Sequence, residues 1–328
     1  LLYVHTADGM MPGNALRISR HSGHLMVLLE AEHLIIKDLT FTGSAHKEAK
    51  LSALGSAIRS LETKHLRIEN CRFYFNSGGV NITNNCYDTI VRNCYFRKNN
   101  SYGYSEMAQL FFGSHCKKNL AENNIILDGR THGLRFYSGA EDCSAVNNII
   151  VNEMIGLYYK ASKGKLLAAN NLVISCKYFN FSDRYGGECR NINNTLEEPC
   201  YIDGENIDNL LFAENNTPLF AAPEYLDYRL QNSSADFGKG AYPEKEAIYY
   251  AAPKNDSSIQ GDGNSSQNPM ADLQKLLDIA EPASTIYLLE GKYSTVKVNK
   301  AATLRGLGEV EISQLQLAAD NIELAGLQ

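Results

Sequence analysis

Apolar and polar residues alternate along short stretches of this chain, and the stretches return at a fixed interval. The segment at 145–150 aligns with 168–173 and again with 191–196, a period of 23 residues. Such a period, without helical spacing of the apolar residues, indicates a solenoid whose units bury their apolar sides only against one another. Alternation with period two favours β-strands, which stack about 4.8 Å apart. We therefore expect an all-β solenoid.

One polar residue, usually asparagine, marks the same point of each repeat. Asparagine tolerates the left-handed backbone of a sharp bend, and its amide can hydrogen-bond to an amide one coil away. Most steps between marks are 22 to 24 residues, but steps of 32 and 30 indicate loops at 43–56 and 99–109. We expect these residues to stack in one column: Asp38, Asn70, Asn93, Asn123, Asn147, Asn170, Asn193 and Asn215.

This pattern resembles the right-handed parallel β-helix of the pectate-lyase-like superfamily, with coils of about 23 residues. A second strand precedes each mark, and its alternation directs one pair of side chains into the core. The residues between and after each pair are then expected to face solvent. The inward pairs are Val80/Ile82, Leu110/Phe112, Leu134/Phe136, Leu157/Tyr159 and Phe179/Phe181.

The chain divides into two parts. Residues 227–238 resemble the closing segment of many bacterial β-helix proteins, and a charged linker at 244–247 separates the first β-helix, 1–243, from residues 248–328. No capping unit is evident in residues 1–32, although an open first coil would expose unpaired backbone groups. We therefore expect the chain to be a piece of a longer protein with further β-helix domains.

The second part is predicted to be the capped start of another β-helix. Asn268-Pro269 predicts a helix N-terminus, and Pro282 predicts the end. Related proteins carry Gly-Asp before the next strand, where this chain has Ala283-Ser284, so the turn is expected to differ. The apolar face of this helix would cover the first coil with Leu273, Leu276, Leu277 and Ala280.

Composition narrows the class of protein. Charged residues make up 21% of the chain and the net charge is −6, which argues against a general nucleic-acid binder. No apolar run has membrane-spanning length. The eight cysteines follow the coil register, where parallel Cβ vectors suit disulfides poorly, so buried free thiols are expected. Their spacing does not suggest zinc.

Candidate chemistry lies on the outward residues of residues 130–190, which carry eight Lys or Arg against five acids. Arg135 and Tyr158 share one register, and Tyr137 and Lys160 share the next. Aromatic rings stack on sugars and cations attract carboxylates, so this face predicts an acidic polysaccharide as ligand. The predicted substrate-binding residues are Arg135, Tyr137, Tyr158, His132 and Asn180.

Lys160 and Arg184 resemble the Lys/Arg pair on consecutive coils of the alginate lyase and chondroitinase B family. That resemblance implies β-elimination at a uronate, with Lys160 as the base and Arg184 as the cation beside the leaving group. In this reaction a base removes the proton α to the carboxyl group and a cation holds the resulting charge. The sequence thus predicts a polysaccharide lyase that is secreted, periplasmic or on the cell surface.

Two other classes of function stay open. Glycoside hydrolysis needs two carboxylates on one face, and Asp142, Asp183, Glu188 and Asp203 are available. Adhesion to a carbohydrate without turnover would use the same groove. The sequence requires no cofactor, but a calcium site could use an oxygen set formed by Asp128, Asn152 and Glu153.

Overall fold

A computed structural model gives the fold in two compact units. The first comprises Leu1–Thr217 with Lys239–Ala241, and the second Pro218–Gly238 with Tyr242–Gln328. The domain boundary at 244–247 stays a prediction; in the contacts, 218–238 belong with the second unit. The structure describes residues 5–6, 16–17, 23–44, 55–99, 108–137, 139–160, 164–181, 188–197, 205–212, 220–222, 227–231, 240–241, 247–254 and 261–327.

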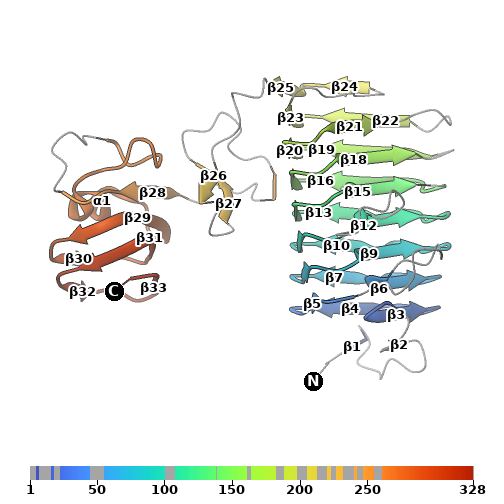
Figure 1. The fold of residues 1–328 in the computed structure, drawn as a ribbon, viewed down its shortest axis with the longest axis horizontal. Helices are drawn as coiled ribbons and strands as arrows, with labels where there is room; N and C mark the ends of the chain where they lie inside the picture. Colours follow the sequence, from blue (N-terminus) through green and yellow to red (C-terminus); the bar gives the residue numbers. More distant parts are fainter. Residues whose placement is uncertain are drawn as a thin grey trace. The chain divides into compact units, whose positions relative to one another are not determined.

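The described part of the first unit is a parallel β-helix with three sheets, in which each strand pairs with its equivalent one coil away (Figure 1). Sheet one contains β1 (His5–Thr6), β4 (Leu34–Lys37), β7 (Arg67–Glu69), β10 (Ile90–Arg92), β13 (Leu120–Glu122), β16 (Cys143–Val146), β19 (Lys165–Ala169), β22 (Glu188–Ile192) and β24 (Glu205–Ile207). Sheet two contains β5 (Thr40–Thr42), β8 (Arg72–Tyr74), β11 (Tyr95–Arg97), β14 (Ile125–Leu127), β17 (Ile149–Val151), β20 (Leu172–Ile174), β23 (Thr195–Glu197) and β25 (Leu210–Phe212). Sheet three contains β2 (Leu16–Arg17), β3 (Met26–Leu29), β6 (Ser56–Leu61), β9 (Gly78–Thr83), β12 (Ala108–Gly113), β15 (His132–Tyr137), β18 (Ile155–Lys160) and β21 (Tyr178–Phe181).

The expectation that residues 1–32 contain no capping unit stays a prediction, but two short described strands there pair with the first coil. The short strand β1 pairs antiparallel with β4, and β2 pairs antiparallel with β3. These pairings occupy backbone groups on sheets one and three that a bare edge would leave open. Two-residue strands have no measurable alternation, so the pattern of apolar and polar residues did not predict these pairings.

The core is built from the inward side chains that alternation predicted. All eight predicted residues on β9, β12, β15 and β18 are at most 1% exposed, which confirms the prediction for these strands. Aromatic rings stack from coil to coil, for example Phe73 on Phe96 at 4.7 Å and Phe112 on Phe136 at 5.2 Å between ring centroids. The side chains of Phe179 and Phe181 lie outside the described residues. The seven cysteines that the structure describes are all free thiols, as expected.

Two adjacent columns of polar residues line one corner of the β-helix. The predicted column, from Asp38 to Asn193, adopts left-handed backbone with φ between 53° and 59° at every coil. Its members hydrogen-bond through side chains only between Asn70 and Asp38, at 3.2 Å, and between Asn193 and Asn170, at 2.9 Å. Asn215 lies outside the described residues.

The second column lies one residue further along each coil and was not predicted. From Asn148 onward each Oδ1 accepts two hydrogen bonds from the coil before, whereas Asn124 Oδ1 accepts one, from the Cys94 N–H. Each Nδ2 of the first four members donates to the next Oδ1 at 2.9 or 3.0 Å. We call this set the buried amide column: Asn124, Asn148, Asn171, Asn194 and Asn209.

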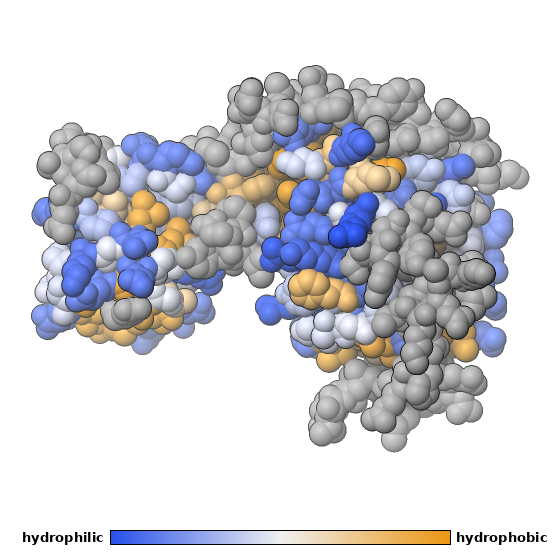
Figure 2. Space-filling model, viewed as in Figure 1, coloured by the Kyte–Doolittle hydropathy of each residue, from blue (hydrophilic) through white to orange (hydrophobic). Residues whose placement is uncertain are grey.

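The described part of the second unit contains short sheets, most of them parallel, and one helix. One sheet has β28 (Ile248–Ala251), β29 (Ser284–Tyr293), β31 (Ala302–Ile312) and β33 (Ile322–Ala325), and β30 (Val296–Val298) pairs with β32 (Leu315–Leu317). β26 (Phe220–Ala222) and β27 (Asp227–Leu230) form an antiparallel pair. Leu317 and Leu324 in the last coil are 54% and 45% exposed, and Figure 2 shows apolar residues along that edge. Their register partners Val298 and Leu304 are fully buried, because another coil lies over them.

The helix α1 (Leu273–Ile279) presents the predicted apolar face to this unit's core. Its four predicted core residues are at most 5% exposed, which confirms the burial. The predicted start was wrong: the N-cap is Asp272, whose carboxylate accepts a hydrogen bond from the Lys275 N–H at 3.0 Å. Asn268 instead donates its side-chain amide to Asp262 in the preceding turn. In the described residues, no helix is long and apolar enough to cross a membrane.

β27, at the start of the segment that resembles a β-helix closure, forms side-chain hydrogen bonds within the second unit. Asp227 of β27 accepts hydrogen bonds from Arg229 and from the hydroxyl of Tyr287 on β29. Burial by itself would raise the pKa of the Asp227 carboxyl, but the Arg229 hydrogen bonds and charge hold it below its usual value. Burial and this carboxylate raise the pKa of Tyr287 to about 12. The hydrogen bonds from Arg229 and Tyr287 thus compensate the buried negative charge of Asp227.

The turn before β29 is strained at Ala283. Its φ is +63°, a conformation that costs a residue with a Cβ about 1–2 kcal/mol. We expect Ala283→Gly to increase the free energy of unfolding by about 1 kcal/mol, since glycine's extra freedom in the unfolded chain offsets part of the gain. Urea unfolding of the full chain measures this. Ala301→Gly, whose φ is not positive, should instead destabilise; a loss of stability in both variants would contradict the strain.

Candidate functional site

The outward residues of sheet three form two columns that run across the coils. Strand register confirms that Arg135 is beside Tyr158 and that Tyr137 is beside Lys160. The first outward column contains Arg59, Asn81, Phe111, Arg135, Tyr158 and Asn180. The second outward column contains Leu61, Thr83, Gly113, Tyr137 and Lys160.

Three aromatic rings surround the guanidinium of Arg135. Its central carbon lies 4.1 Å from the centroid of the Tyr137 ring, 5.3 Å from Tyr158 and 5.5 Å from Phe111. The rings of Tyr137 and Tyr158 are stacked with centroids 6.3 Å apart. Lys160 adds its ammonium at 5.6 Å from the Tyr137 centroid. Cations over ring faces are attracted by the ring quadrupole. These contacts therefore hold the guanidinium of Arg135 and the ammonium of Lys160 close to the aromatic rings.

Two residues expected at the surface are buried. Arg135 is 6% exposed because neighbouring rings cover it, and His132 is 5% exposed. His132 is the first residue of β15, and its ring meets the Tyr158 ring edge-on at 5.1 Å. The surface therefore consists of the partly exposed Tyr137, Tyr158 and Lys160, with the charge of Arg135 directly beneath. Removal of this charge from water strengthens its field at the surface.

Several predicted site residues are not brought together with this surface by the described structure. Arg184, Asp183 and Asp203 lie outside the described residues, as do 45–54 and 100–107 of the two predicted loops. Asn180 is beside Tyr158 in register, but its side chain is also outside the described part.

Carboxylates lie away from the two outward columns. Glu188 begins β22 of sheet one, and Asp142 directly precedes β16 of the same sheet. Neither shares the face that carries Lys160. At the described positions of the two outward columns, no residue is Asp or Glu. This separation matters for the type of sugar chemistry that the face could perform.

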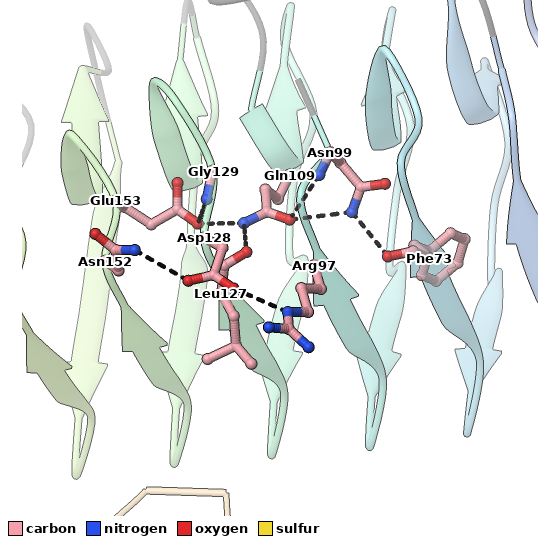
Figure 3. A network of polar contacts seen from close by, with 9 residues as sticks. All are labelled: Phe73, Arg97, Asn99, Gln109, Leu127, Asp128, Gly129, Asn152 and Glu153. Carbon is pink, nitrogen blue, oxygen red and sulfur yellow. Dashed lines mark hydrogen bonds and ion pairs between the residues drawn. The ribbon is translucent and has the colours of Figure 1, made fainter. Parts of the chain in front are cut away.

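Of the residues proposed for calcium, Asp128 has its carboxylate engaged with protein groups (Figure 3). Asp128 accepts from Asn152 Nδ2 at 3.0 Å and from Arg97 Nε at 2.8 Å. Glu153 is buried inside the β-helix. Among the residues that the structure describes, no cluster of three or more His, Cys, Asp or Glu could hold a metal ion. A calcium site stays a prediction.

Figure 3 shows a run of polar side chains inside the β-helix, which the sequence pattern did not predict. Asn99 follows the left-handed residue Lys98, as Gly129 follows Asp128 one coil later. Gly129 has no side chain, and Gln109 fills the place instead. Gln109 accepts from Asn99 Nδ2 at 3.0 Å and donates to the Leu127 carbonyl at 2.8 Å. The buried amide of Gln109, which comes from β12, thus continues this run of polar side chains past Gly129.

Glu153 continues this run as a carboxyl group in an amide position. Its Oε1 accepts from the Gly129 N–H at 2.9 Å and from Gln109 Nε2, while its Oε2 is buried without a hydrogen-bond partner. Burial raises the pKa of Glu153 to about 8, so the group is mostly protonated at neutral pH. A strongly shifted pKa often marks a catalytic group, but Glu153 is 3% exposed and points away from the outward columns. We assign it to the interior structure.

One comparison with known proteins supports this architecture. The family of right-handed β-helix regions matches residues 14–196, more than half of the chain, and the protein therefore belongs to that family. A search of curated proteins finds no match. Among solved structures, a mutant of the PL6 family alginate lyase AlyGC is similar at 11% identity with a TM-score of 0.17, covering 90% of this chain and 61% of that one. The chain thus spans less than two thirds of that structure's length.

Proposed function

We propose that the outward face of β15 and β18 binds an acidic polysaccharide and cleaves it by β-elimination. The observation that carries this proposal is the cluster of Tyr137, Tyr158 and Lys160 over the buried Arg135. Aromatic rings offer flat apolar surface to sugar rings, and the two cations favour an anionic polymer. A polymer substrate also suits a protein that works outside the cytoplasm.

The proposed reaction needs one base and no second carboxylate. Lys160, as the neutral amine, takes the proton α to the uronate carboxyl group; the electron pair of that C–H bond forms the new double bond, and the glycosidic C–O bond breaks. The leaving oxygen then gains a proton from solvent, and Lys160 later releases the proton that it took. Arg135 favours the negative charge that develops, and Arg184 is proposed as the cation beside the leaving group. Hydrolysis has less support, because the described outward positions lack the two carboxylates that it needs.

We expect Lys160→Ala to reduce turnover of the true substrate at least ~100-fold while binding is largely retained. Arg184→Ala should weaken both turnover and binding. The assay is a screen of alginate, pectate and glycosaminoglycans for the ultraviolet absorbance of an unsaturated product, together with binding measured at two salt concentrations. Lys165→Ala, an exposed lysine on sheet one, is the matched control.

The outcomes separate the three classes of function. An unsaturated product that depends on Lys160 supports the lyase. Reducing ends without a double bond would indicate a hydrolase, and salt-sensitive binding without any product would indicate an adhesin. A binding affinity that does not change with salt concentration would contradict an anionic ligand.

A further inference from the structure

Two side chains at the other end of the first outward column have unused hydrogen-bonding capacity. Arg59 on β6 and Asn81 on β9 are register partners, so they are neighbours on the outer face of sheet three. Arg59 Nε and Asn81 Oδ1 are both buried and have no hydrogen-bond partner. Buried polar atoms are normally paired with protein or solvent, but this donor and this acceptor each have no partner. One bound group that both accepts and donates hydrogen bonds would satisfy both atoms.

His24 brings a second donor to the same place. The Ser56 N–H donates to His24 Nδ1 at 2.8 Å, so the proton of the neutral ring is on Nε2. Burial, followed by the Arg59 charge, lowers the pKa of His24 to about 4, and the ring is therefore neutral. Its Nε2 lies 3.3 Å from Arg59 NH1. Two N–H groups thus face each other, and an acceptor shared between them would remove the conflict.

Among the residues that the structure describes, no carboxylate is paired with Arg59. Within the described residues, the partly buried Arg67, Arg97 and Arg229 each form an ion pair with an aspartate. Arg59 is partly buried too, but its one side-chain contact there is the neutral ring of His24. A half-buried guanidinium without a carboxylate favours an anionic ligand, and its planar fork matches a carboxylate or sulfate.

We propose that His24, Arg59 and Asn81 form a subsite for an acidic sugar unit. The carboxylate of the sugar accepts hydrogen bonds from Arg59 and from His24 Nε2–H, and a hydroxyl on the same unit donates to Asn81 Oδ1. The assignment to a sugar rests on the proposed function. Along the column, Arg59 is three strands from Arg135, roughly 14 Å at about 4.8 Å a strand, with Phe111 between them. A polymer with several anionic units could engage both ends.

Isothermal titration of the full chain with D-glucuronate, neutral D-glucose and inorganic sulfate tests the subsite. Glucuronate and sulfate should bind, glucose should not, and Arg59→Gln should weaken both anions at least ~10-fold. Asn81→Ala should weaken glucuronate and leave sulfate within about 2-fold, because sulfate has no hydroxyl to donate. Arg67→Gln, which removes an arginine from sheet one, is the control and should change neither. Arg59→Lys, which keeps the charge but loses the fork, should give an intermediate affinity.

Failure of this subsite and failure of the proposed cleavage are distinguishable. Binding of glucuronate that depends on Arg59 and persists in Lys160→Ala supports the subsite, even if no polysaccharide is cleaved. Anion affinity unchanged by Arg59→Gln, or no binding of either anion, overturns it. Sulfate binding without glucuronate binding overturns the assignment to a sugar. Melting curves of each variant confirm that a lost affinity is not a lost fold.

Discussion

Replacing Glu153 with glutamine is expected to stabilise the protein above neutral pH and to flatten its pH dependence. Folding raises the pKa of Glu153 from 4.5 to about 8, so the stability that the protonated group contributes is complete below pH 4.5 and is lost as pH rises through 8. At about 1.4 kcal/mol for each unit of pKa, the loss amounts to roughly 3–5 kcal/mol. Glutamine keeps the acceptor for Gly129 and Gln109 and cannot ionise.

The measurement is urea unfolding of the full chain between about pH 5 and about pH 9, a range that brackets this titration. The wild type should lose stability across the range, and Glu153→Gln should lose much less. Glu122→Gln, at a partly exposed position of β13, is the control and should follow the wild type. If Glu153→Gln lost stability as steeply as the wild type, ionisation of Glu153 would not be the cause.

Removing Asn148 from the middle of the buried amide column should cost about 4 kcal/mol or more, because each buried group left unpaired costs about 1–3 kcal/mol. Its Oδ1 accepts from the N–H and Nδ2 of Asn124 at 3.1 and 3.0 Å. Its Nδ2 donates at 3.0 Å to the Ala121 carbonyl and to Asn171 Oδ1. Asn148→Ala therefore removes four hydrogen bonds and leaves a cavity.

The adjacent Asn147 provides a matched control. It has a φ of 56°, which glycine adopts without strain, and its Oδ1 has no hydrogen-bond partner. Asn147→Gly should therefore change the free energy of unfolding by less than about 1 kcal/mol. Urea unfolding of the two variants measures the contrast, and equal effects would show that the buried amide column contributes no more than the adjacent column that contains Asn147.

Much of the fold could be predicted because a solenoid repeats its constraints. Each strand pairs with its equivalent one coil away, so the coil length must stay nearly constant and appears as a period in the sequence. Alternation then placed Phe112 and Phe136 in the core, where they stack. The capping helix was predicted from its apolar face, but its start was misplaced at Asn268, because Asn268 and Asp272 are both good N-caps and only the turn geometry distinguishes them.

The strand register of the candidate site residues could be predicted, but the surroundings of their side chains could not. Register follows from the period, so the neighbours of Lys160 could be named. Arg135 is buried because the rings of Phe111 and Tyr158, which lie on two other coils, are turned toward it. The pattern of residues along the chain does not contain the orientation of these rings. The same holds for Arg59, whose missing partner is evident only once His24 and Asn81 are in place beside it.

The sequence by itself determined the period, the strand alternation and hence the β-helix with its inward residues. Only the tertiary structure decided which asparagine of each Asn-Asn pair is buried. At 147–148 both residues are equally polar, and the turn gives the first a left-handed backbone at the corner and directs the second inward to its equivalents. It likewise decided that Gln109 fills the place left by Gly129 and that Glu153 is neutral. These outcomes depend on distances between coils, whereas the period depends only on the length of each coil.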